Sequence, residues 1–211
     1  MRASRIAPAL LLLLALGATA LWSQTVRVGV HSVAMTHNEV NESRTAEGVG
    51  GAASLILRWR RLGLEAVGLR ASMKPDSADL RDFDVLQWDV RLSFWVAPVV
   101  AIEIGGGART VDPEFAAPDV GAIRIGFVSE YPMARIASVR ARGAYLVNPR
   151  FNGGGEAGLA VELGLGVAVG TANGRFRVKA ESEFQRIDRA VNSVEVPIQV
   201  TLATFGVELG F

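Results

Sequence analysis

The 211-residue sequence predicts an all-β fold: a transmembrane antiparallel up-and-down β-barrel that follows an N-terminal export segment. Two observations beyond that segment predict it. From Thr25 onward, apolar residues alternate with polar or small ones almost throughout, which is the period of a strand and not of a helix. The connections between these alternating segments are short and long in turn, as in barrels with tight turns at one end and loops at the other.

The first residues have the order of a secretory signal peptide. Arg2 and Arg5 precede an apolar run over 7–20 that ends in a small-residue cleavage motif. The run is shorter than the roughly 20 apolar residues that span a bilayer as a helix. We expect a signal peptide over 1–20, with cleavage as late as Ser23, and a barrel over 21–211. An uncleaved anchor is the alternative.

Ten segments carry the alternation after the export segment, with eight strands as the alternative number. Each is long compared with the strands of soluble proteins, which usually have about 5–6 residues. Their length suits a tilted strand that crosses a bilayer, which needs about 9–11 residues. The predicted strands are 25–35, 50–60, 62–72, 84–96, 99–110, 120–129, 134–147, 157–169, 174–186 and 195–211.

The connections predict which end of the barrel is which. Short turns are expected at 60–62, 97–98, 130–132 and the hairpin pair Asn173-Gly174. Longer polar loops are expected at 36–49, 73–83, 111–119, 148–156 and 187–194. The short side of such barrels is periplasmic, and ten strands place both termini there, as export requires.

Two segments fit the alternation poorly. Glu65 and Arg70 have opposite parity within one strand, so we expect a bulge between them or one of them near a strand end. In the last strand the apolar parity switches between Leu202 and Phe205, and a bulge at 202–204 would reconcile its two halves.

The polar parity indicates which face is inside. It carries many mid-strand charges and also many glycines, such as Gly105 and Gly164, a mixture that suits a narrow interior better than a soluble exterior. We therefore expect the apolar parity to face lipid, with a soluble secreted barrel or sandwich as the alternative. The predicted lumen charges are Arg58, Asp89, Arg91, Glu103, Arg109, Arg124, Arg140, Arg142, Glu162, Arg177, Lys179, Glu181 and Glu183.

Aromatic residues near the predicted strand ends suggest interfacial girdles. The predicted girdle residues are Trp59, Phe94, Trp95, Phe127, Tyr131, Tyr145 and Phe211.

The C-terminal strand carries a motif of its own, in which Thr204, Gly206, Leu209 and Phe211 recur at fixed spacing. This pattern resembles the assembly signal of bacterial outer-membrane β-barrels, and the mature chain resembles small OmpA-, OmpX- or OmpW-like barrels of Gram-negative bacteria. The resemblance implies export through the periplasm, periplasmic chaperones, recognition by the barrel-assembly machinery, and outer-membrane lipid around the barrel. It specifies no surface partner.

Composition excludes several functions. The formal net charge of +1, which becomes −1 when Arg2 and Arg5 are removed (20 basic and 21 acidic residues), predicts no nucleic-acid partner. The sequence has no Cys, hence neither disulfides nor a lipoprotein anchor site. With two His and no ligand spacing, we expect no metal and no cofactor.

We also expect no catalysis. Lipid A deacylases need His and Ser on one face, whereas adjacent His31 and Ser32 point to opposite sides of a strand. Omptin proteases use Asp and His at the outer rim, where the sequence offers His37 with acidic residues of the next predicted loop. Those acids are Asp76, Asp79, Asp82 and Asp84, which as loop acids are expected to be solvated.

The sequence therefore predicts an integral outer-membrane barrel with a structural, surface-interaction or envelope-integrity role. The alternative is a narrow channel for small solutes or anions, since the predicted lumen charges comprise eight basic and five acidic residues. Paired charges favour a plug over an open pore, because unpaired buried charge is costly. Loops 36–49 and 148–156 would then be the exposed recognition elements.

Overall fold

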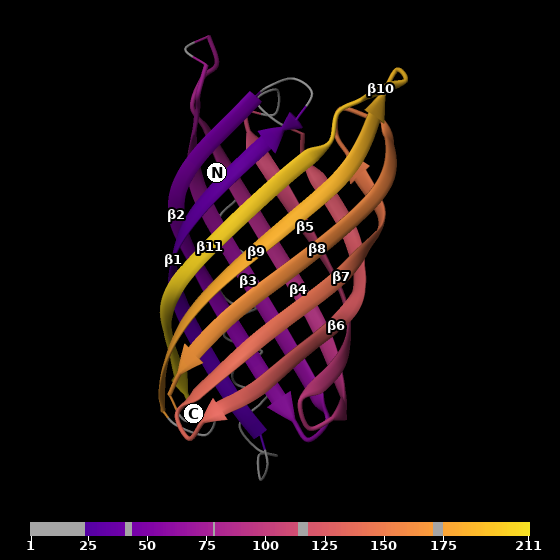
Figure 1. The fold of residues 1–211 in the computed structure, drawn as a ribbon. Coiled ribbons are helices and arrows are strands. Elements are labelled where there is room, and N and C mark those ends of the chain that lie inside the picture. Colours follow the sequence, from indigo (N-terminus) through magenta and orange to yellow (C-terminus); the bar gives the residue numbers. More distant parts are fainter. Residues whose placement is uncertain (1–23, 41–43, 78, 114–117, 171–174) are drawn as a thin grey trace, which may run out of the picture.

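The computed structural model describes residues 24–40, 44–77, 79–113, 118–170 and 175–211, and it folds them into a barrel of ten long strands inclined to the barrel axis (Figure 1). A two-residue strand, β10, lies in the last connection. The strands are β1 (Gln24–Glu39), β2 (Arg44–Trp59), β3 (Leu62–Pro75), β4 (Phe83–Ala97), β5 (Val100–Asp112), β6 (Val120–Ala134), β7 (Ala137–Phe151), β8 (Glu156–Val169), β9 (Phe176–Val191), β10 (Val194–Glu195) and β11 (Ile198–Gly210).

The barrel closes between its first and last strands. Each long strand pairs antiparallel with its neighbours in sequence, and β1 completes the circle by pairing with β11 from Arg27–Gly210 to Glu39–Ile198. The backbone N–H of Phe211 also donates to the carbonyl of Val26, at 2.9 Å. Closure leaves no long strand with an unpaired edge, which is the condition for a sheet in lipid.

The two faces of the barrel follow the predicted alternation. In β4, Leu86, Trp88 and Leu92 are exposed on the outside, while Asp89 and Arg91 between them are 5% and 3% exposed inside. The same inversion recurs in β8, where Leu163 is 57% exposed and Glu162 is 1% exposed. The predicted fold, a closed antiparallel barrel with its apolar parity outward, is confirmed.

The strands extend further toward the loop end than predicted. Much of the expected loop over 36–49 is strand, because β1 and β2 stay paired as far as Glu39 and Arg44. Likewise the expected loop over 148–156 shrinks to 152–155. Polar residues in these segments belong to strands, since ladder hydrogen bonds and not side-chain polarity set where pairing ends.

The short-turn end also differs in one place. We predicted a turn at 130–132, but β6 continues to Ala134 and turns at 135–136. Two other turns, at 60–61 and 98–99, lie where they were expected. The predicted turn residues Asn173 and Gly174, and the signal peptide over 1–20, lie outside the described residues.

Neither of the two parity conflicts is resolved by a bulge. β3 pairs without a register shift, so Glu65 points into the lumen while Arg70 points out near the loop end. β11 is also continuous, so the predicted bulge at 202–204 is wrong. In β11, Ile198, Val200 and Leu202 are buried inside, and the apolar residues that follow face outward. The lumen itself changes from apolar to charged along this strand.

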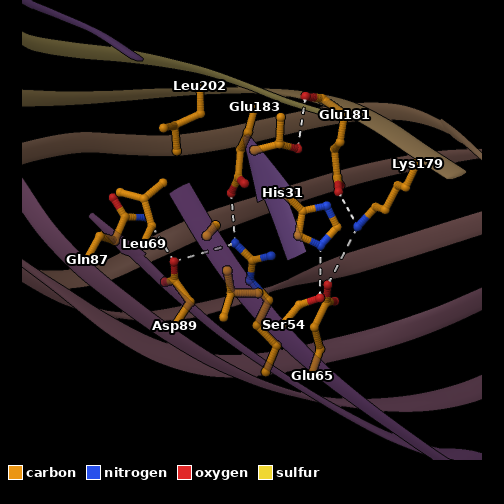
Figure 2. A pocket seen from close by; sticks show the side chains of 14 residues that line it. His31, Ser54, Glu65, Leu69, Gln87, Asp89, Lys179, Glu181, Glu183 and Leu202 are labelled. Carbon is orange, nitrogen blue, oxygen red and sulfur yellow. Dashed lines mark hydrogen bonds and ion pairs between the residues drawn. The ribbon is translucent and has the colours of Figure 1, made fainter. Parts of the chain in front are cut away.

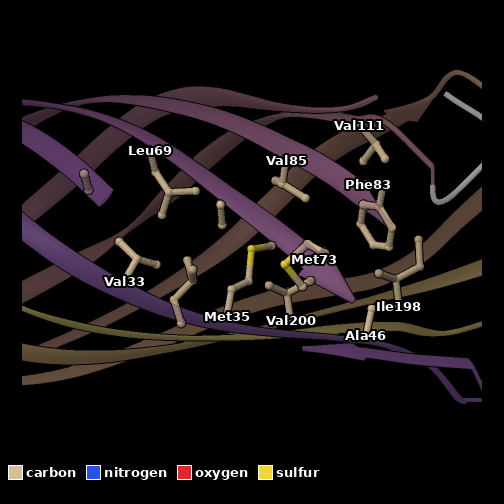
Figure 3. Close-up of a cluster of buried hydrophobic side chains, with 13 residues drawn as sticks. Val33, Met35, Ala46, Leu69, Met73, Phe83, Val85, Val111, Ile198 and Val200 are labelled. Atoms are coloured by element: carbon tan, nitrogen blue, oxygen red, sulfur yellow. The ribbon is translucent and has the colours of Figure 1, made fainter. Parts of the chain in front are cut away.

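The loop half of the lumen is filled by apolar side chains. One cluster, the apolar plug, is built on β1 to β5 and β11 around Met35, Met73 and Ile198, which are at most 2% exposed (Figure 3). A second cluster on β6 to β9 consists of Val120, Leu146, Ala160 and Ile187. Phe151 packs against both, so together the clusters draw on every long strand.

No helix among the described residues is long and apolar enough to span a membrane.

Candidate functional site: a charged network in the lumen

A network of paired charges occupies the middle of the lumen, next to the apolar plug. Its members occupy inward positions of the strands, where every second residue points its side chain into the lumen. Figure 2 shows these side chains converging from opposite walls around a small cavity of about 50 Å³. Leu69 and Leu202 line the same cavity and belong to the apolar plug, so the two regions meet there.

Two arginines and three carboxylates form the part of the network nearest the plug. Arg124 lies 2.6 Å from Asp89 and 3.2 Å from Glu162. Arg91 lies 3.3 Å from the same Glu162 and 2.8 Å from Glu183. Each guanidinium thereby bridges carboxylates that come from different strands, which ties β4 and β6 to β8 and β9 across the lumen.

Glu65 is the centre of the rest of the network. Arg140 donates to both of its carboxylate oxygens, at 3.3 and 2.7 Å, and Arg142 donates to it at 2.6 Å. Lys179 lies 3.9 Å from Glu65 and 2.5 Å from Glu181. Glu65 is 7% exposed, so a carboxylate on β3 is held among cations from β7 and β9.

The structure places all thirteen predicted lumen charges at inward positions. Those not named above are Arg58, beside Trp95 and Glu130; Glu103, 3.2 Å from Arg142; Arg109, which donates to Gln185 at 2.5 Å; and Arg177, 2.9 Å from Glu130. The prediction that Trp95 belongs to an outer girdle is wrong. Its ring lies inside the barrel, 3.8 Å from the Arg58 guanidinium, and lines a lumen cavity.

Four further charged residues lie in the lumen and were missed. Arg27 shares the parity of His31, but it lies in a segment with no other charge to mark its face. Glu65 and Glu208 sit in the two strands whose parity was ambiguous, and Glu130 was assigned to a turn. With them and Glu39, which is buried beside His37 at the loop end, the lumen charges named here come to nine basic and nine acidic residues, so the predicted excess of eight to five vanishes.

Both histidines are buried inside the barrel, each beside one polar side chain. His31 Nε2 lies 3.0 Å from Ser54 Oγ, a pair that the sequence did not reveal, but its Nδ1 has no hydrogen-bond partner among the described residues. No carboxylate there orients the ring as in a hydrolytic triad. His37 is buried 3.5 Å from Glu39, and Asp84 instead faces outward against Arg70. In the described part of the chain, no three His, Asp or Glu side chains are grouped to hold a metal ion.

The four residues of the C-terminal motif are divided between the two faces of β11. Leu209 and Phe211 are 49% and 80% exposed on the outside, whereas Thr204 and Gly206 face the lumen. A Cβ on Gly206 would collide with the carbonyl of Val30 and the ring of His31. Gly206 therefore lets β11 approach β1 where the barrel closes, in addition to any role in assembly.

No protein-family model and no curated protein matches the sequence. Several solved structures are similar in fold. Neisserial surface protein A is 12% identical with a TM-score of 0.44, covering 88% of this chain and 97% of that one. The outer membrane protease OmpT from Escherichia coli is 9% identical with a TM-score of 0.46, covering 89% and 96%. An outer membrane channel from Pseudomonas putida F1 is 12% identical with a TM-score of 0.48, covering 89% and 95%.

The distribution of apolar and charged side chains between the two faces of the barrel shows whether it is surrounded by water or by lipid. Large apolar side chains are exposed around the outside while arginines and glutamates are buried within, which is the inverse of a water-soluble domain. A closed antiparallel barrel with an outward apolar band and a polar interior is the architecture of bacterial outer-membrane proteins. The protein is an outer-membrane β-barrel whose outer face contacts lipid.

Proposed function

We propose that this outer-membrane barrel is sealed and serves a structural, surface-interaction or envelope-integrity role, without catalysing a reaction. The observation that carries the proposal is the filling of the lumen by two successive layers. The apolar plug and its neighbouring cluster meet at Phe151, and the charged network lies below them. Solutes would have to displace both layers, one of them held by ion pairs across the barrel.

Conductance across a planar bilayer tests the seal. The folded protein, inserted as judged by its heat-dependent gel mobility, should give no stable ion steps. A variant thinned in both layers at once, Met73→Ala with Arg91→Ala, is the matched positive control, provided that the same mobility shift shows it to be folded. Stable steps from the unaltered protein would favour the alternative, a narrow channel for small solutes or anions.

The absence of catalysis has its own test. Ser54 is the serine that the structure pairs with a histidine, and its hydroxyl would be the nucleophile of any hydrolytic reaction there. In cells that lack the protein, we expect greater sensitivity to bile salts or bulky antibiotics. Ser54→Ala should restore resistance as well as the unaltered chain does. A folded Ser54→Ala barrel that fails to restore it would contradict a purely structural role.

We also propose that the C-terminal motif directs assembly, through periplasmic chaperones and the barrel-assembly machinery. Phe211 is the most exposed of its residues and follows the last strand, so its side chain packs little within the barrel. Deletion of Phe211 should lower the amount of assembled protein in cells while leaving refolding of the purified chain in detergent almost unchanged. Equal losses in both assays would make Phe211 a stability residue instead.

A further inference from the structure

The lumen holds a second cavity, the vestibule, at the short-turn end. It has a volume of about 140 Å³ and extends from the charged network, whose Glu65, Arg91 and Lys179 also line it, toward Arg58, Trp95, Glu130, Arg140 and Arg177. The guanidinium-bearing residues Arg58, Arg140 and Arg177 lie within three residues of the short-turn ends of their strands. The vestibule is thus a pocket near the periplasmic end, with the network and the plug above it.

The charge of the vestibule is unbalanced. Its described lining residues include six basic and four acidic side chains. Arg91 and Lys179 are paired with Glu183 and Glu181 outside the lining, whereas at the short-turn end Arg58 and Arg177 share the single carboxylate of Glu130. A concave site with low-dielectric walls focuses such an excess and raises the local concentration of anions. The pocket therefore attracts the opposite charge to a degree that the overall composition conceals.

Several donors around the vestibule are not used within the protein. The indole Nε1 of Trp95 and the Nε atoms of Arg140 and Arg177 are buried without a hydrogen-bond partner among the described residues. Arg58 is held loosely, 3.9 Å from Glu130 and stacked 3.8 Å from the Trp95 ring, with its side chain 40% exposed. A Cβ on Gly63 would collide with Ser93 Oγ, so this glycine makes room for a hydroxyl in the vestibule wall next to Trp95.

We propose that the vestibule is a binding site for a small oxyanion, a phosphate- or carboxylate-bearing solute that enters from the periplasm. Arginine forks match both anions, and charge-assisted hydrogen bonds to them are the strong kind. A water molecule takes about 30 Å³ of liquid volume, so the vestibule has room for an ion of a few heavy atoms. Glu130 occupies part of this cationic set as an internal competitor, 2.9 Å from Arg177. Binding here does not depend on whether the barrel is sealed above.

The experiment is a titration of the full barrel in uncharged detergent with inorganic phosphate, and separately with acetate, against chloride at equal ionic strength. Binding that draws Arg58 off the indole should change tryptophan fluorescence saturably, and calorimetry measures it without the optical reporter. Trp95→Phe should abolish the optical change and, because it also removes the indole donor, weaken calorimetric binding without abolishing it. No saturable response to either anion would overturn the proposal.

Two variants should move the affinity in opposite directions. Arg58→Gln removes a loosely held cation and should weaken binding about tenfold, the value of one charge-assisted hydrogen bond. Glu130→Gln removes the internal competitor and should tighten binding. Arg70→Gln, on the outer face near the loop end, is the matched control and should leave affinity unchanged. Equal weakening by Arg58→Gln and Arg70→Gln, or no tightening by Glu130→Gln, would show general charge screening and not a site.

Discussion

The two halves of the lumen are filled from the same strands by opposite chemistries. On β3, Met73 and Leu69 enter the apolar plug, and Glu65, closer to the short turns, enters the charged network. On β4, Val85 belongs to the plug and Arg91 to the network. Both halves exclude solvent, with Met73 at 0% and Glu162 at 1% exposed. These two residues are therefore equally buried, and what differs between them is the consequence of removing one.

In the plug, a lost group leaves a void, whose cost depends on how far its neighbours relax. In the network, a lost group also leaves its partners as buried charges without compensation, and these cannot relax away. Several network residues, such as Glu65 and Arg142, have more than one partner, so the loss of one of them affects more than one ion pair. The charged half should thus be the less tolerant half, although a complete set of buried ion pairs is not in itself more stabilising than apolar packing.

The largest effect is expected from Glu65→Gln. The change keeps the size of the side chain but removes the negative charge that faces Arg140, Arg142 and Lys179. We expect the free energy of unfolding to fall by about 3–5 kcal/mol, measured by urea titration of the barrel in lipid vesicles. The control is Glu47→Gln, at an exposed position on β2. A loss no larger than that of the control would remove the distinction between the two halves.

Met73→Ala probes the plug in the same assay. Met73 is fully buried among apolar neighbours, so its truncation should cost about 2–5 kcal/mol through lost burial and a residual cavity. Met73→Leu nearly conserves volume and should cost less than about 1.5 kcal/mol. If Met73→Leu were as damaging as Met73→Ala, the plug would depend on exact shape, and the greater tolerance argued for it would be wrong.

The sequence predicts the charged half of the lumen better than the apolar half. Period-two alternation identified the charged half of the lumen. A charge on one parity and a large apolar residue on the other define the two faces unambiguously, as at Asp89 and Trp88. It failed for the plug, because an inward Ile198 and an outward Leu209 look alike in sequence. The parity switch in β11, from which we predicted a bulge, instead marks the boundary between the apolar half and the charged half of the lumen. Pairings across the lumen, such as Arg91 with Glu183, depend on strand stagger, which alternation does not encode.

A matched pair of serine substitutions sharpens where that boundary lies. Ala71 is 1% exposed within the plug, whereas Ala52 lines the cavity that also holds His31 and Ser54. A hydroxyl at Ala71 finds only apolar neighbours and should cost about 1–3 kcal/mol, the usual cost of an unsatisfied buried polar group. Ala52→Ser should cost less, because polar partners are at hand. Ala52 also belongs to the plug, at its edge, so equal costs in urea titrations would show that the polar side of the cavity does not reach it and would move the boundary toward the network.

The smallest effect is expected from Asp84→Asn, which tests whether burial or charge pairing makes the network intolerant. Asp84 lies 2.6 Å from Arg70 and accepts a hydrogen bond from Ser72 at 2.7 Å, a geometry as close as that of Arg142 with Glu65. The Arg70 side chain, however, is 74% exposed on the outer face, so solvent and headgroups can replace its partner. Asp84→Asn should therefore leave the free energy of unfolding almost unchanged, because exposed ion pairs contribute little to stability. A loss as large as that of Glu65→Gln would mean that close pairing itself carries the stability, and the contrast between the charged and apolar halves of the lumen could no longer be ascribed to uncompensated buried charge.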